Sequence, residues 1–133
     1  MITYMEYKSN NSQVYLINYH LIWCPKRRKK VLVSKIKDRL EQIIKQVANE
    51  KHVDILALEI MPDHLHLFVS TYPQLEIHKL IKLFKGRSSN ILRKEFPELK
   101  KMPCMWTRSY FISTAGNVSN GTIRKYIKNQ LKK

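Results

Sequence analysis

The stretch that decides the fold is Met61-Pro62-Asp63-His64-Leu65-His66-Leu67-Phe68-Val69-Ser70. Pro62 and Asp63 are typical of a tight turn, and the run after them favours a strand. Because strand side chains alternate between faces, His64 and His66 point to one side and the leucine between them points to the other. Two imidazoles on one strand face can form half of a metal site. From this pattern alone, the plainer interpretation is a half-exposed polar strand face.

The residues around this stretch predict the first part of the fold. Val53 to Met61 and residues 64–71 are expected to form an antiparallel hairpin, because only two residues connect them. A long strand is expected over Val14 to Cys24, ended by Pro25. Ser34 can cap a following helix whose apolar residues recur at helical spacing.

The second half of the chain predicts another helix and another strand. Leu75 to Phe96 is the helix, and Gly86 near its middle is a position where it can bend or break. Met105 to Thr114 alternates as a strand. Four of its side chains are expected on one face: Trp106, Arg108, Tyr110 and Ile112. Residues 115–121 contain two of the three glycines and predict a hinge, and residues 122–133 predict a short C-terminal helix.

This order of elements is strand, helix, strand, strand, helix, strand, followed by the C-terminal helix. It predicts the α+β class with a ferredoxin-like or RRM-like fold, in which two helices cover one face of a four-stranded antiparallel sheet. The other face is then free to hold a site, although the fold alone proves no function. We expect residues 1–133 to form a single domain, with residues 1–12 as an N-terminal segment.

The charge of the chain is its most unusual bulk property. The 133 residues include 25 Lys and Arg against 10 Asp and Glu, a formal net charge of +15. Such an excess attracts polyanions, with nucleic acid as the first candidate and an anionic membrane surface as the second. The chain has no apolar run long enough to span a membrane and begins with a largely polar segment, so we expect a cytoplasmic protein. Cys24 and Cys104 have no CxxC partner, which is typical of reduced thiols.

A second polar group lies in the expected C-terminal helix. Tyr126 and Gln130 are four residues apart and share a helical face, which packing and solvation can also explain. The chemical alternative is that the tyrosine hydroxyl attacks a phosphodiester, and a DNA 3′-OH later reverses the attack. A divalent metal on His64 and His66 would orient the phosphate, with the Gln130 carbonyl oxygen as a third ligand. Such donors suit Mn²⁺ well and Mg²⁺ acceptably.

Four stretches together resemble the single-tyrosine transposases of the insertion-sequence 200/605 group. They are Tyr19-His20-Leu21-Ile22-Trp23-Cys24-Pro25-Lys26-Arg27-Arg28, Met61-Pro62-Asp63-His64-Leu65-His66, Trp106-Thr107-Arg108-Ser109-Tyr110-Phe111 and Ile123-Arg124-Lys125-Tyr126-Ile127-Lys128-Asn129-Gln130. The short His64-Leu65-His66 motif matches the His-hydrophobic-His (HUH) motif of nucleases that cut single strands through a tyrosine. All four stretches in this order are far more specific than the histidine motif alone.

This resemblance implies a transposase that binds imperfect hairpins in single-stranded DNA at element ends, cuts both ends through 5′-phosphotyrosine links and rejoins them. It implies that His64, His66 and Gln130 hold the metal and that Tyr126 is the nucleophile. It also implies homodimers in which the tyrosine helix of one subunit completes the histidine site of the other. A hinge at residues 115–121 would allow this helix to act in cis or in trans.

Several basic residues are candidates for DNA contact, although a solvated surface charge is the plainer interpretation of any one of them. They are Arg27, Arg28, Lys29, Lys30, Lys82, Lys85, Arg87 and Arg108. The tyrosines and tryptophans of the first and last strands are expected in the core more often than as platforms on which bases stack. His20 and His78 are expected to be ordinary structural or surface histidines.

Three other functions are weighed against the transposase. A host-domesticated or replication-initiating HUH nuclease would share the chemistry and differ in its DNA target. A metal-dependent phosphodiesterase without a covalent step would not need Tyr126. A non-enzymatic RNA- or DNA-binding module would need the exposed aromatic motif of RRM sheets, and the sequence carries His64 and His66 where that motif would stand.

Overall fold

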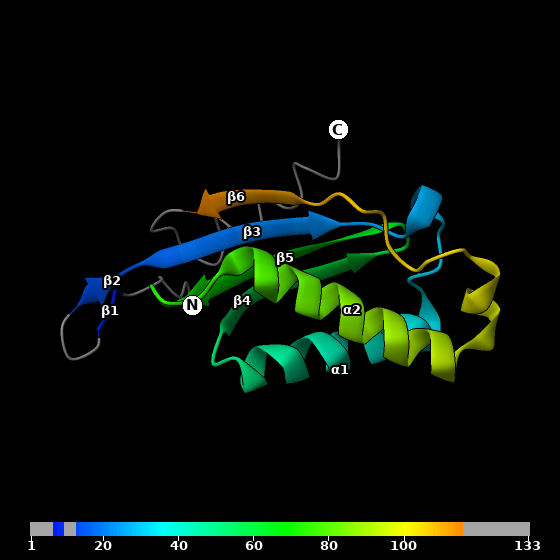
Figure 1. The fold of residues 1–133 in the computed structure, drawn as a ribbon, viewed down its shortest axis with the longest axis horizontal. Helices are drawn as coiled ribbons and strands as arrows, with labels where there is room; N and C mark the ends of the chain where they lie inside the picture. The colour runs from blue at the N-terminus through cyan, green and yellow to red at the C-terminus, as the bar shows by residue number, and fades with distance from the viewer. Residues whose placement is uncertain (1–6, 10–12, 116–133) are drawn as a thin grey trace.

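A computed structural model describes residues 7–9 and 13–115 of the chain, and a four-stranded antiparallel sheet lies at its centre (Figure 1). The sheet has the strand order β4-β5-β3-β6, and helices α1 and α2 lie on one of its faces. The strands and helices are β3 (Ile17–Trp23), α1 (Ser34–Glu50), β4 (Asp54–Met61), β5 (His64–Thr71), α2 (Ile77–Glu95) and β6 (Phe111–Ala115). The predicted α+β ferredoxin-like fold is confirmed. The predicted C-terminal helix lies outside the described residues, as does the predicted hinge apart from its first residue, which ends β6.

The main core lies between the sheet and the two helices. Leu21 of β3 and Leu67 of β5 are fully buried there against helix residues such as Ile43 and Phe84. The side chains that alternate with these strand residues point to the opposite face. The register confirms this arrangement, because Ile22 pairs with His66 and His20 pairs with Phe68 across β3 and β5. The histidine pair therefore occupies the sheet face opposite α1 and α2.

The first predicted strand is divided in the structure. A short β2 (Val14–Tyr15) pairs with β1 (Lys8–Ser9) in a separate two-stranded sheet, and β3 begins only at Ile17. The predicted hairpin is confirmed, since β4 and β5 pair as antiparallel neighbours with Met61 opposite His64. The 3-10 helix η1 (Lys26–Arg28) follows β3 in the predicted basic loop.

The predicted cap at Ser34 is wrong. Val33 precedes the helix and no side chain caps it, while Ser34 is itself the first helical residue, with a φ angle of 51°. The entry to α1 is instead held by Leu32, which is buried and whose N–H donates to the carbonyl oxygen of Pro62 at 3.0 Å. Its burial and this hydrogen bond anchor the chain two residues before the helix begins.

The predicted strand over Met105 to Thr114 is too long at its beginning. The 3-10 helix η2 (Pro97–Lys101) comes first, and β6 begins only at Phe111. The residues between them do not join the sheet as a strand, because they form hydrogen bonds with α2 instead. Trp106 is buried and its indole N–H lies 3.0 Å from the Ser88 hydroxyl on α2. The Lys85 ammonium donates to the carbonyl oxygen of Thr107 at 2.7 Å. Helix α2 also continues through Gly86 without a break, contrary to the possibility raised by the sequence.

Candidate functional site

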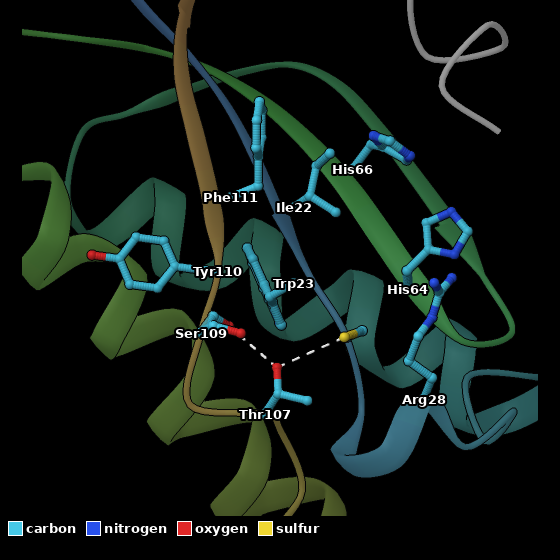
Figure 2. A pocket seen from close by; sticks show the side chains of 10 residues that line it. Ile22, Trp23, Arg28, His64, His66, Thr107, Ser109, Tyr110 and Phe111 are labelled. Atoms are coloured by element: carbon cyan, nitrogen blue, oxygen red, sulfur yellow. Dashed lines mark hydrogen bonds between the residues drawn. The ribbon is translucent and has the colours of Figure 1, made fainter. Parts of the chain in front are cut away.

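A cavity of about 560 Å³ opens beside the histidine pair (Figure 2). His64 and His66 project from β5 to the same side, and Arg28 reaches toward His64 from η1. The opposite rim consists of the segment that leads into β6, including Tyr110, and of Phe111, the first residue of β6. Residues from separate parts of the chain therefore share one cavity: Ile22, Trp23, Cys24, Arg28, His64, His66, Thr107, Ser109, Tyr110 and Phe111.

His64 is held from the turn that precedes β5. Its Nδ1 lies 2.7 Å from Oδ1 of Asp63, and the second carboxylate oxygen of Asp63 lies 3.1 Å from Nη2 of Arg28. The hydrogen bond with His64, and secondarily the charge of Arg28, lower the pKa of Asp63 below its ordinary value. Asp63 is therefore a carboxylate at neutral pH, and it connects the histidine to the basic loop.

His66 is held by a histidine on the neighbouring strand. Nδ1 of His66 lies 2.9 Å from Nε2 of His20, and both side chains are almost completely buried. Burial lowers the pKa of His20 and of His66 to about 4, with a smaller effect from the charge of the adjacent histidine in each case. Both imidazoles are thus neutral at physiological pH, which is the form that can bind a metal.

His20 is the functional candidate that sequence reasoning missed. It was expected to be an ordinary structural or surface residue, and it is buried in the sheet beside His66. The local signal for His20 was a histidine in a strand that is mostly apolar. His78, by contrast, is exposed on α2 as expected.

The two site histidines fit a divalent metal through the same ring nitrogen. Each has its Nδ1 engaged, His64 with Asp63 and His66 with His20, which is the support that metal-binding histidines ordinarily have. No hydrogen bond within the described part of the chain engages either Nε2. Residues 7–9 and 13–115 contain no cluster of three or more His, Cys, Asp or Glu side chains that could hold a metal. The described residues thus offer two imidazole ligands, and the predicted Gln130 and Tyr126 lie outside them.

The eight basic residues proposed for DNA contact have different surroundings. Arg28 lines the cavity, while Arg27, Lys29, Lys30, Lys82 and Arg108 are exposed. Arg87 forms an ion pair with Glu50 of α1. Lys85 is half-buried and hydrogen-bonds the segment before β6. The last two therefore have structural partners that the sequence did not reveal.

The aromatic residues of β3, of β6 and of the segment before β6 include both buried and exposed side chains. Trp23 and Trp106 are buried in the core, as expected. Tyr110 and Phe111 are instead 38% and 46% exposed and line the cavity, so the assignment of Tyr110 to the core is wrong.

A family model described as an IS200-like transposase matches residues 13–130. The chain belongs to this family. The ISDra2 transposase TnpA of Deinococcus radiodurans is 36% identical over 129 residues, which cover 95% of this chain and 92% of that protein. The transposase for insertion sequence element IS200 of Salmonella typhimurium is 29% identical over 116 residues, which cover 85% of this chain and 76% of that protein.

Solved structures agree with this assignment. A crystal structure of a protein described as a transposase from Deinococcus radiodurans R1 has a TM-score of 0.77 at 36% identity and covers 92% of this chain and 97% of its own. A REP-associated tyrosine transposase bound to a REP hairpin has a TM-score of 0.57 at 15% identity, covering 90% of this chain and 68% of its own, so that likeness concerns the fold alone. The resemblance deduced from the sequence is confirmed, and the protein is a transposase of DNA. Among the described residues, no helix is both long and apolar enough to cross a membrane.

Proposed function

We propose that this transposase cleaves and rejoins single-stranded DNA at hairpin-marked element ends through a 5′-phosphotyrosine intermediate. A divalent metal, Mg²⁺ or Mn²⁺, would be held by His64, His66 and Gln130, and Tyr126 would be the nucleophile. The observation that carries the proposal is the pair of imidazoles of His64 and His66 on the sheet face opposite α1 and α2, each with Nδ1 engaged, in one cavity with Arg28.

Two properties of the protein support binding of the scissile phosphate at this site. Arg28 supplies a guanidinium that can donate to phosphate oxygens from the rim of the cavity. The formal charge of +15 attracts the DNA backbone to the protein. When bound, the metal would neutralise charge on the phosphate oxygens and help to align the reacting atoms.

The chemical step follows from the tyrosine. The Tyr126 oxygen forms a bond to phosphorus as it loses its proton, and the bond from phosphorus to the 3′ oxygen breaks. The released 3′ oxygen takes up a proton, and the 5′ phosphate remains on the tyrosine. In the reverse direction, a DNA 3′-OH attacks this phosphotyrosine, reseals the strand and returns the tyrosine hydroxyl. No external energy source is required, because the ester keeps the energy of the broken bond.

A hairpin is the proposed recognition element. The related fold of the REP-associated tyrosine transposase is described in a complex with a REP hairpin. The exposed basic side chains of η1, together with Lys29 and Lys30 that follow it, are suited to grip the phosphates of such a structure.

The proposed working unit is a homodimer of single-domain chains of residues 1–133. Exchange of two DNA ends with one catalytic tyrosine per chain requires two chains. The hinge at residues 115–121 and the tyrosine helix at residues 122–133 would complete the site of the partner subunit or of the same chain.

The decisive experiment uses single-stranded oligonucleotides that carry an imperfect hairpin with randomised flanks and a fluorophore at the 3′ end. Incubation with Mn²⁺ or Mg²⁺ should give a denaturant-resistant adduct that carries the 3′ label, because the 5′ phosphate stays on the protein. Tyr126→Phe should abolish the adduct, whereas Tyr7→Phe, a change at an exposed tyrosine, should not. An adduct that persists in Tyr126→Phe would refute the nucleophile. Cleavage without an adduct would favour the phosphodiesterase.

The metal and the dimer have separate tests. Addition of EDTA, or the His64→Ala substitution, should abolish cleavage while binding of the hairpin persists. If sites are shared between chains, a mixture of His64→Ala and Tyr126→Phe proteins should regain cleavage that neither shows alone. A mixture that stays inactive would place both groups in one chain.

A further inference from the structure

The bond between His20 and His66 has the geometry of a directed hydrogen bond. The ring planes lie within 16° of each other, the ring centroids are 5.1 Å apart, and the two nitrogens are 2.9 Å apart. The centroid distance is close to the nitrogen separation plus the two ring radii, so both nitrogens lie near the line between the ring centres. The N–H of one ring therefore points along the lone pair of the other. Between neutral imidazoles, one nitrogen must donate and the other accept.

The orientation of the His20 ring is fixed by its aromatic neighbours. Phe68, its pairing partner on β5, stacks on it with a centroid distance of 4.2 Å and an interplanar angle of 5°. Phe111 of β6 approaches it edge to face, with centroids 5.7 Å apart. These contacts hold Nε2 of His20 against His66 from a buried and well-packed position.

The partner of His64 is Asp63, which also holds the histidine through Nδ1. The carboxylate of Asp63 can only accept a hydrogen bond, so the proton of the bond must lie on Nδ1 of His64. Arg28 in turn holds the other carboxylate oxygen. In a neutral imidazole, a proton on Nδ1 leaves the lone pair on Nε2.

We propose that His20 and Asp63 are positioning residues that keep His66 and His64 in the Nδ1-protonated tautomer, so that both present the Nε2 lone pair to one divalent cation. In this arrangement Nε2 of His20 accepts a hydrogen bond from the Nδ1–H of His66, and both histidines have the metal-binding tautomer before a metal binds. The inference deepens the proposed function and rests on it, because the opposite tautomer of His66 would place a proton on the nitrogen that must bind the cation.

The tautomers can be read directly in the metal-free protein. Protein labelled with ¹⁵N-histidine, kept in EDTA at neutral pH, should give long-range ¹H–¹⁵N correlations that place the proton on Nδ1 in both His64 and His66. A predominant Nε2 proton on His66 would overturn the role of His20, and one on His64 would overturn the role of Asp63. This measurement requires neither DNA nor metal.

Substitutions at His20 separate positioning from packing. His20→Phe keeps an aromatic ring on Phe68 and removes the acceptor, whereas His20→Gln supplies an amide oxygen as an acceptor. We expect His20→Phe to lose the Nδ1 preference of His66 and to weaken Mn²⁺ binding, measured by calorimetry, by about 10–100-fold. His20→Gln should restore much of the affinity, and His78→Phe on the exposed surface of α2 should leave it unchanged. Should His20→Phe fail to fold, the tautomer of His66 can still be measured in His20→Gln and in the unsubstituted protein. A proton on Nε2 of His66 in the unsubstituted protein would refute the role of His20.

Failure of this inference can be distinguished from failure of the proposed function. Unsubstituted protein with both Nδ1 tautomers and no Mn²⁺ binding would refute the metal site and leave the tautomer assignment standing. Normal Mn²⁺ affinity and an unchanged His66 tautomer in a folded His20→Phe protein would refute the role of His20 and leave the metal site standing.

Discussion

The guanidinium of Arg28 lies 3.1 Å from the carboxylate of Asp63, and this pair joins the basic loop after β3 to the turn before β5. Both segments are far apart in the sequence, and both end at the cavity that contains the histidine pair. Arg28 is therefore distinguished from its neighbour Arg27, which is exposed in the same loop and does not line the cavity. The sequence shows a run of equivalent charges, whereas the structure gives one of them a position at the site.

Arg28→Gln is expected to reduce DNA cleavage about tenfold or more, because a hydrogen bond to a charged group contributes about 1.5–3 kcal/mol. Arg27→Gln removes the same charge from the same loop and is the matched control. Single-turnover cleavage at one fixed salt concentration compares the two. Both variants should keep their stability to within about 1 kcal/mol, since the Arg28 side chain is 63% exposed in its ion pair. Equal loss of cleavage in both variants would contradict a specific role for Arg28.

The local part of the site could be predicted from the sequence, because it depends on neighbouring residues. A two-residue turn sets the hairpin of β4 and β5, and strand alternation alone places His64 and His66 on one face. The contact between His20 and His66 depends instead on the register of β3 against β5. A shift of one residue in that register would move His20 to the helix-covered face, and no local pattern specifies it.

A pH dependence of stability follows from the two buried imidazoles. In the folded protein the pKa of His20 and of His66 is lowered from 6.5 to about 4. Between these values the unfolded chain binds protons that the folded chain does not, so the free energy of unfolding falls as the pH falls through this window. The slope is at most about 1.4 kcal/mol per pH unit for each histidine.

Urea denaturation of the metal-free protein in EDTA at several pH values between neutral and acidic measures this slope. His20→Phe should give a shallower dependence than the unsubstituted protein, because one of the two groups is removed. His78→Phe is the control and should leave the slope unchanged, since His78 is exposed on α2. A pH-independent stability across this window would contradict the buried, neutral state of the pair.

Lys85 and Lys82 provide a second matched comparison on α2. Lys85→Met removes hydrogen bonds of 2.7 Å and 3.3 Å to the carbonyl oxygens of Thr107 and Arg108, which lie in the segment that leads to the cavity rim. We expect a loss of about 1.5–3 kcal/mol in stability, as for hydrogen bonds to charged groups, together with slower cleavage. Lys82→Met removes an equal charge from the exposed face and should change neither property by much.

The salt dependence of DNA binding controls for the loss of charge in Lys85→Met and Lys82→Met. Each variant lacks one positive charge, so a purely electrostatic role predicts the same change in the salt slope for both. Equal losses of cleavage would indicate that Lys85 acts through its charge on DNA. A larger loss in Lys85→Met, with a lowered melting temperature, would indicate that it holds the segment before β6.

The tertiary contacts of this segment explain why the last strand was predicted too long. Alternation of apolar residues from Met105 onward is typical of a strand. Trp106 fits this apolar pattern, but its side chain enters the core and hydrogen-bonds Ser88 of α2. It does not belong to a strand of the sheet. The Lys85 ammonium takes carbonyl oxygens that a strand would offer to its neighbour. Partners supplied by a distant helix thus override a local pattern.

Gly86 is the site of a stabilising substitution. Helix α2 continues through this residue, and a Cβ atom added there would meet no atom within 4 Å beyond its chain neighbours and the adjacent helix backbone. Alanine restricts the unfolded chain more than glycine does, so Gly86→Ala should stabilise the protein by about 0.5–1 kcal/mol. Thermal denaturation should show a melting temperature a few degrees higher, and Lys82→Ala, an exchange between good helix formers, should change it far less. Cleavage of the hairpin oligonucleotide should be unaffected, since Gly86 does not line the histidine cavity. A lower melting temperature in Gly86→Ala would mean that the helix needs the conformational freedom of glycine at this position.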